Sequence, residues 1–164
     1  SSSEKRKMGD RCFMRLRIGG TITSAGIDAL VEACDSVVIE REEIEDAIKR
    51  GEPLEVEAEE VNWGSADDIE RTCIDHDLTY NIYNGEGGSY GAGVKYWKPG
   101  MPESTSRVMT HEGQALTYTD LDAITKKETS KAKKFDAVLR WFNTDFDVPP
   151  LSREEPSKDE PTVE

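Results

Sequence analysis

Two stretches of the chain alternate between polar and apolar residues, and this pattern limits the folds that the chain can adopt. Residues 11–18 read RCFMRLRI and residues 54–63 read LEVEAEEVNW. Alternation with a period of two is typical of a β-strand that buries one face and exposes the other. In the second stretch the apolar residues resume one position late at Val61, which predicts a β-bulge near Glu59 and Glu60.

Turn and cap residues divide the rest of the chain into short elements. Gly19 and Gly20 are predicted to end or bend the first strand. Gly51 suits the position just after a helix, and Pro53 prevents that helix from continuing. Helices are expected after Thr23 or Ser24, across residues 40–50, after Ser65, and after Thr119 as far as a stripe formed by Phe135, Val138, Leu139 and Phe142.

The remaining apolar segments are short and predict strands. They cover residues 78–83, 94–97, 105–110 and 114–119, the last two as a hairpin around Glu112 and Gly113. Strands mixed with helices in this order indicate an α+β fold. We expect a mixed or mostly antiparallel sheet of about five or six strands with three or four helices, and a ferredoxin-like core is one arrangement that these elements allow.

Length and composition favour one domain with two unstructured ends. A chain of 164 residues is long enough for one real core. Residues 1–9 are interpreted as a tag or a disordered N-terminus, and residues 10–146 as a single domain. Residues 147–164 read DVPPLSREEPSKDEPTVE, which is rich in proline and charge. This acidic tail is expected to be disordered because it offers almost nothing to bury.

The acidity of the protein is regional. Residues 28–77 contain 18 acids and four bases, a net charge of −14, whereas the whole chain carries −13. Direct binding of nucleic acid is not expected, because such affinity comes from Lys and Arg that neutralise phosphates. A basic protein surface, such as that of a nucleic-acid-binding protein, is the favoured partner. No apolar run of about 18 residues predicts a membrane span.

The cysteines and the glycine-rich loop carry weak chemical signals. Three scattered cysteines favour a reducing, cytoplasmic setting over a disulfide framework. Cys73 and His76 have the spacing of metal ligands, but a second pair is missing. The loop GEGGSYGAG lies between two predicted strands, whereas phosphate loops precede a helix. We therefore expect no metal, no cofactor and no catalytic residues.

Exposed acids and tyrosines remain as the candidate site. On a strand, alternate side chains lie about 6.6–6.8 Å apart on one face. A row of glutamates at that spacing resembles a row of backbone phosphates, although an ordinary solvated face is the alternative interpretation. Tyr and Trp are also enriched at protein interfaces. The predicted partner-binding residues are Glu42, Glu43, Glu45, Asp46, Glu55, Glu57, Glu59, Glu60, Asp67, Asp68, Tyr83 and Tyr90.

These features lead to three functional hypotheses. The first is a non-enzymatic interaction protein whose acidic face binds a basic partner, in its sharpest form a nucleic-acid-mimicking inhibitor of a host nucleic-acid-binding complex, of phage or plasmid type. The second is a small ligand-binding domain or enzyme with its site at the aromatic, glycine-rich loop of residues 83–97. The third is a scaffold subunit of a larger complex.

Overall fold

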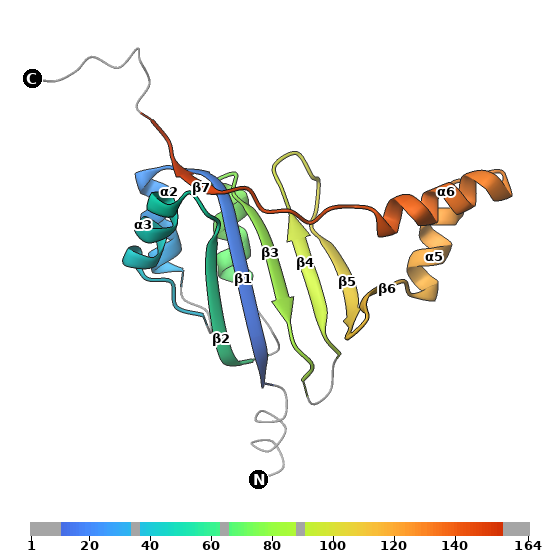
Figure 1. Cartoon of the computed structure of the whole chain (residues 1–164), viewed down its shortest axis with the longest axis horizontal. Helices are drawn as coiled ribbons and strands as arrows, with labels where there is room; N and C mark the ends of the chain where they lie inside the picture. The colour runs from blue at the N-terminus through green and yellow to red at the C-terminus, as the bar shows by residue number, and fades with distance from the viewer. Residues whose placement is uncertain (1–10, 34–36, 63–65, 88–90, 156–164) are drawn as a thin grey trace, which may run out of the picture.

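The computed structural model describes residues 11–33, 37–62, 66–87 and 91–155. The described residues form seven strands and five helices (Figure 1). In chain order these are β1 (Arg11–Ile22), α2 (Ser24–Glu32), α3 (Arg41–Arg50), β2 (Leu54–Asn62), α4 (Asp67–Asp75), β3 (Thr79–Asn84), β4 (Gly93–Trp97), β5 (Thr105–Thr110), β6 (Gly113–Ala115), α5 (Tyr118–Thr125), α6 (Lys131–Phe142) and β7 (Leu151–Arg153).

The strands form one sheet in the order β2-β1-β3-β4-β5-β6, in which all neighbours are antiparallel. The seventh strand, β7, pairs with β1 in parallel. The predicted α+β class with a mostly antiparallel sheet is therefore confirmed. The ferredoxin-like arrangement stays a prediction.

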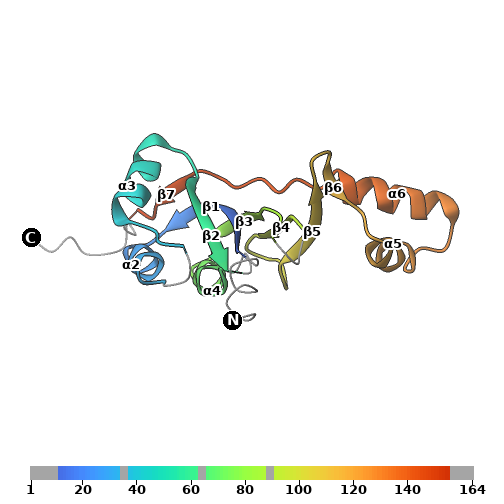
Figure 2. The same cartoon turned by 90° about the horizontal axis from the view of Figure 1, so that it is seen from below.

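The core lies between one face of the sheet and the helices of the N-terminal half. Leu16 of β1 and Val56 of β2 lie side by side on that face, as their alternation predicts. α2 and α4 cover this face, while the chain between α6 and β7 crosses the opposite face (Figure 2). The helices contribute Ile27, Leu30, Ile44, Ala47, Ile69 and Cys73 to the core. Burial of these apolar side chains is the main favourable term that holds the helices on the sheet.

Several local predictions are confirmed in detail. Cys12 pairs with Val61 and Met14 pairs with Ala58, so β2 carries one extra residue at the predicted bulge. Gly51 adopts a left-handed conformation, with φ of 65°, at the end of α3. A residue without a Cβ accepts this conformation at little cost.

The last helical region begins two residues earlier than the sequence pattern suggests. Thr117, and not Thr119, is the N-cap of α5, and its hydroxyl accepts a hydrogen bond from the backbone N–H of Asp120 at 3.1 Å. Ser65, the expected cap of α4, lies outside the described residues.

The expectation of a disordered tail from residue 147 onward is wrong for residues 147–155. Residues 143–150, which we call the strap, run from α6 across the open face of the sheet to β7 (Figure 1). The ring of Phe146 stacks on Tyr96 of β4, with centroids 4.7 Å apart. The Asn81 side chain of β3 donates a hydrogen bond to the carbonyl of Phe146 at 3.1 Å. Val148 and Leu151 are buried, so two apolar side chains and a strand pairing order this segment.

Gly19 does not end β1, which continues to Ile22. A Cβ on Gly19 would overlap the carbonyl oxygen of Pro149 in the strap. The glycine is therefore required because the strap passes directly over the backbone of β1 at this position.

α5 and α6 pack against each other as a hairpin that projects beyond β6 (Figure 1). We call residues 118–142 the arm. The apolar stripe predicted on α6 does not face the core: Phe135 and Phe142 are 62% and 48% exposed. The opposite side of α6 is the buried one, through Ala137.

Gly19→Ala should destabilise the protein by about 1–3 kcal/mol, the usual cost of forcing an extra methyl group into packed structure. The added Cβ must displace the strap at Pro149. Chemical denaturation followed by circular dichroism measures this change. Gly91→Ala is the matched control, because a Cβ there has no described atom within 4 Å. Equal midpoints for the two variants would show that the strap does not press on β1.

Removal of residues 148–164 should lower the free energy of unfolding by about 3 kcal/mol or more, because burying one aliphatic side chain contributes about 1.5–3 kcal/mol. The deletion removes two buried side chains, Val148 and Leu151, and the pairing of β7. Removal of residues 156–164 alone leaves every described contact in place and serves as the control. If the two truncated proteins melt at the same temperature, residues 148–155 contribute nothing to stability.

Candidate partner-binding surface

The predicted row of glutamates lies on the open face of the sheet, as expected, but it is not a row of carboxylates alone. Glu55, Glu57 and Glu59 are exposed on β2. The register pairs Glu57 with Arg15 of β1 and Glu55 with Arg17. The Arg15 Nε lies 3.0 Å from Glu57 Oε1 and 3.8 Å from Glu55 Oε1. One arginine therefore offsets part of the charge of two glutamates.

The acids of α3 have different local roles. The Glu43 side chain accepts a hydrogen bond from the backbone N–H of Glu40 and caps the start of the helix. Glu45 forms an ion pair with Arg153 of β7. Glu42 and Asp46 are exposed on the same helix. Because α3 packs against β2, these two acids and the β2 glutamates lie at one edge of the body, which we call the acidic edge.

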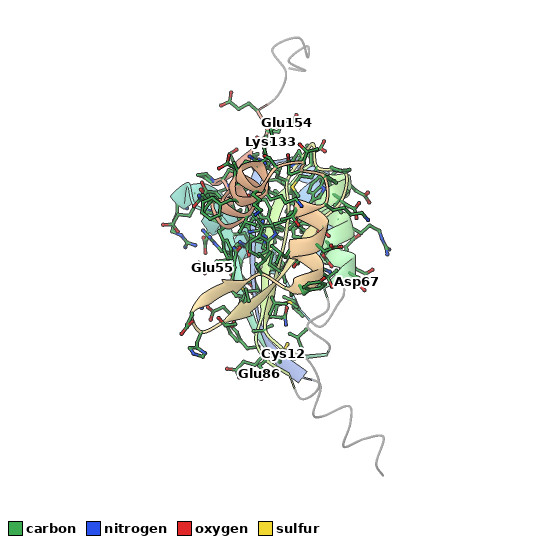
Figure 3. All side chains as sticks on the ribbon, turned by 90° about the vertical axis from the view of Figure 1, so that its right-hand side faces the viewer. Cys12, Glu55, Asp67, Glu86, Lys133 and Glu154 are labelled. Atoms are coloured by element: carbon green, nitrogen blue, oxygen red, sulfur yellow. The ribbon has the colours of Figure 1, made fainter. Side chains whose placement is uncertain are left out.

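The acids of α4 are not part of that edge. Asp67 and Asp68 occupy the first turn of α4, where negative charge favours the positive end of the helix dipole. Asp68 also lies 3.7 Å from Arg71. Glu55 and Asp67 point away from opposite sides of the sheet (Figure 3). The regional acidity thus surrounds the body and does not form a single face.

Tyr83 of β3 lies next to the acidic edge, one strand further into the sheet than Arg15. It is half-buried on β3 and stands opposite Arg15, so Glu57, Arg15 and Tyr83 form one cross-strand row. Cross-strand neighbours of this kind contact each other directly. Tyr90 and the side chain of Glu60 lie outside the described residues.

Sequence reasoning missed a buried polar cluster on the helical face. Glu70 of α4 is only 9% exposed. The Tyr80 hydroxyl donates a hydrogen bond to Glu70 Oε1 at 3.1 Å, and Lys95 Nζ lies 3.2 Å from the same oxygen. Burial raises the pKa of Glu70 above its ordinary value, although Lys95 and Tyr80 act in the opposite direction. Among the 34 acids of the chain, no sequence pattern distinguishes Glu70 from its exposed neighbours.

Arg107 of β5 is the second residue that sequence reasoning missed. It is 7% exposed, and its guanidinium lies 3.8 Å from the ring centroid of Trp141 and 4.6 Å from that of Phe146. Its Nη1 donates hydrogen bonds to the Gln114 side chain and to the Trp141 carbonyl, both at 2.6 Å. Burial lowers the pKa of Arg107, while the charge of Asp120 opposes this effect. A lone arginine at an alternating strand position gives no sequence signal for this role.

The described residues show no cluster that could hold a metal. Cys73 is buried, and burial together with the charge of Glu70 raises the pKa of its thiol, which disfavours the thiolate that a metal requires. No group of three or more His, Cys, Asp or Glu side chains gathers in the described part of the chain. Within the same residues, no helix has the length and apolar character needed to cross a membrane.

No protein-family model, curated protein or solved structure matches this chain. Any functional proposal therefore rests on the chemistry of these surfaces.

The contribution of Glu70 to stability should decrease as pH rises. A carboxyl group whose pKa is raised on folding favours the folded state most below its unfolded value of about 4.5, and this contribution is lost as pH rises through the folded pKa. We expect the difference in free energy of unfolding between the wild type and Glu70→Gln to be largest below pH 4.5 and to decrease above it. Denaturation at a series of pH values measures this.

Tyr80→Phe provides the second arm of that experiment. It removes a hydrogen bond that favours ionised Glu70, so the decrease should move to higher pH. A difference between wild type and Glu70→Gln that instead grows with pH would mean that pairing with Lys95 outweighs burial.

Proposed function

We propose that this protein is a non-enzymatic interaction protein whose acidic edge binds a basic surface of a partner protein. The observation that carries the proposal is that exposed acids from two adjacent elements, α3 and β2, gather at one edge of the body. Glu42 and Asp46 come from α3, and Glu59 comes from β2. Interfaces with complementary charge associate quickly and select their partners electrostatically.

Tyr83 supports a protein partner over a small cation. Its ring lies in the cross-strand row beside Arg15 and Glu57, at the inner border of the acidic edge. An aromatic side chain next to a charged rim is typical of protein interfaces, because it offers apolar contact area and a polar hydroxyl. A partner that contacts this row would therefore combine basic side chains with an apolar group.

The sharper form of the proposal, mimicry of nucleic acid, is less favoured than a general acidic docking surface. Mimicry needs a continuous series of negative charges, whereas Arg15 bridges Glu57 and Glu55 in the middle of the row. A partner site that binds phosphates would contact the positively charged guanidinium of Arg15 at this position. We therefore propose a basic protein partner without requiring that its site be one for nucleic acid.

A charge-reversal experiment tests the proposal. The test variant changes Glu42, Asp46 and Glu59 to Lys, because these exposed acids have no ion pair among the described contacts. Glu55 and Glu57 are left unchanged so that Arg15 keeps its partners. A partner captured from lysate with and without nuclease is first identified, and its affinity is then measured by calorimetry at several salt concentrations.

The test variant should abolish binding, and wild-type binding should weaken as salt rises, because exposed charges are screened beyond about 8 Å at physiological ionic strength. The matched control changes Glu103, Glu112 and Asp122 to Lys, which alters net charge equally at exposed positions outside the acidic edge. Equal losses from both variants would indicate that only bulk charge matters. Full binding by the test variant would refute the acidic edge as the site.

A further inference from the structure

A hollow is lined by residues of β5, of the helices α5 and α6, and of the loops beside them. The two helices lie at the end of the molecule away from the acidic edge (Figure 1). The volume of the hollow is about 370 Å³, within the range of small-molecule sites. The floor and walls combine apolar groups, among them Ala137 and the ring of Trp141, with three cations and one acid. The charged lining residues are Arg107, Lys127, Arg140 and Glu128.

Among the residues that line this hollow, Arg107 has a side-chain donor without a hydrogen-bond acceptor in the described structure. Its guanidinium lies over the rings of Trp141 and Phe146, which leaves the N–H groups at its edge as the means of binding further atoms. The Nε–H of Arg107 is buried and has no hydrogen-bond partner among the described residues. Leaving a buried donor of a charged group unpaired costs free energy. A planar guanidinium edge matches the two oxygens of a carboxylate.

The charge balance of the hollow also favours an anion. Glu128 lies 3.9 Å from Arg140 at the rim and offsets one cation. Asp120 influences Arg107 electrostatically but forms no ion pair with it within the described residues. Two positive charges therefore remain in the lining, and its uncharged residues are apolar or aromatic except for Thr144.

We propose that this hollow binds a small organic carboxylate, with the carboxylate at the edge of Arg107 and the apolar part of the ligand against Ala123, Ile124 and Trp141. The apolar walls favour an organic anion over inorganic phosphate, which would leave them without contact. Lys127 and Arg140 add attraction from the rim.

Calorimetry with benzoate, benzamide and inorganic phosphate as probes tests the proposal on the full chain. Benzoate should bind saturably, whereas benzamide, its neutral counterpart, and phosphate should bind at least about tenfold more weakly, since a hydrogen bond to a charged group contributes about 1.5–3 kcal/mol. Equal binding of benzamide would show an apolar hollow without a charge requirement. Preference for phosphate, or no saturable binding of benzoate, would also overturn the proposal.

Variants locate the binding in this hollow. Lys127→Gln and Arg140→Gln should each weaken benzoate binding about two- to fivefold, as expected for exposed ion pairs. Lys133→Gln is the matched control, because this exposed lysine of α6 does not line the hollow. Arg107→Lys keeps the charge but loses the planar edge, and should weaken binding at least tenfold in protein whose circular dichroism confirms folding. Unchanged affinity in both rim variants would place benzoate elsewhere.

Discussion

The stack of Trp141, Arg107 and Phe146 is the interaction on which the arrangement of the C-terminal third depends. The guanidinium comes from β5, while the two rings come from the arm and from the strap. One buried side chain thus fixes the arm against the sheet and sets the starting point of the strap. From Phe146 the strap follows a path fixed by contacts with β3, β4 and Gly19, and ends in the pairing of β7 with β1. Cation–π contacts gain strength when the cation is desolvated, as it is here.

Local features of this fold could be predicted from sequence because they depend on neighbouring residues. The alternation of β2, its bulge at Glu59 and Glu60, and the glycine that ends α3 all follow from patterns a few residues long. The strap could not be predicted, because its order depends on contacts with strands far away in the chain. Composition alone makes residues 147–155 resemble a disordered tail, yet Val148 and Leu151 find buried positions on a surface that other segments build. Gly19 illustrates the same limit, since its missing side chain is explained only by Pro149.

The candidate site shows a similar division between local and long-range information. The sequence identifies the exposed acids of β2 and α3, but not the cations that meet them. Arg15 reaches Glu57 because the register of β1 and β2 places the two side chains on one face. Glu45 meets Arg153 only because the strap carries β7 to the opposite edge of the sheet. Ion pairing therefore decides which acids stabilise the fold and which are available to a partner. These ion pairs depend on the tertiary structure.

The two ends of the molecule carry charges of opposite sign, and the strap links them. Residues 126–140 of the arm and its loop contain six bases and two acids, in contrast to the acidic edge. Four strand spacings, about 19 Å, separate β2 from β5, which exceeds the screening length of about 8 Å at physiological salt. Charge bound at one end therefore has little direct effect on the other. The chain itself also connects the two ends. α6 leads through the strap to β7, and Arg153 of β7 forms an ion pair with Glu45 of α3. The strap lies against β1, β3 and β4 along this route. A shift of the arm that moved Phe146 would therefore pull on the strap and strain the contacts that hold β7 beside the acidic edge.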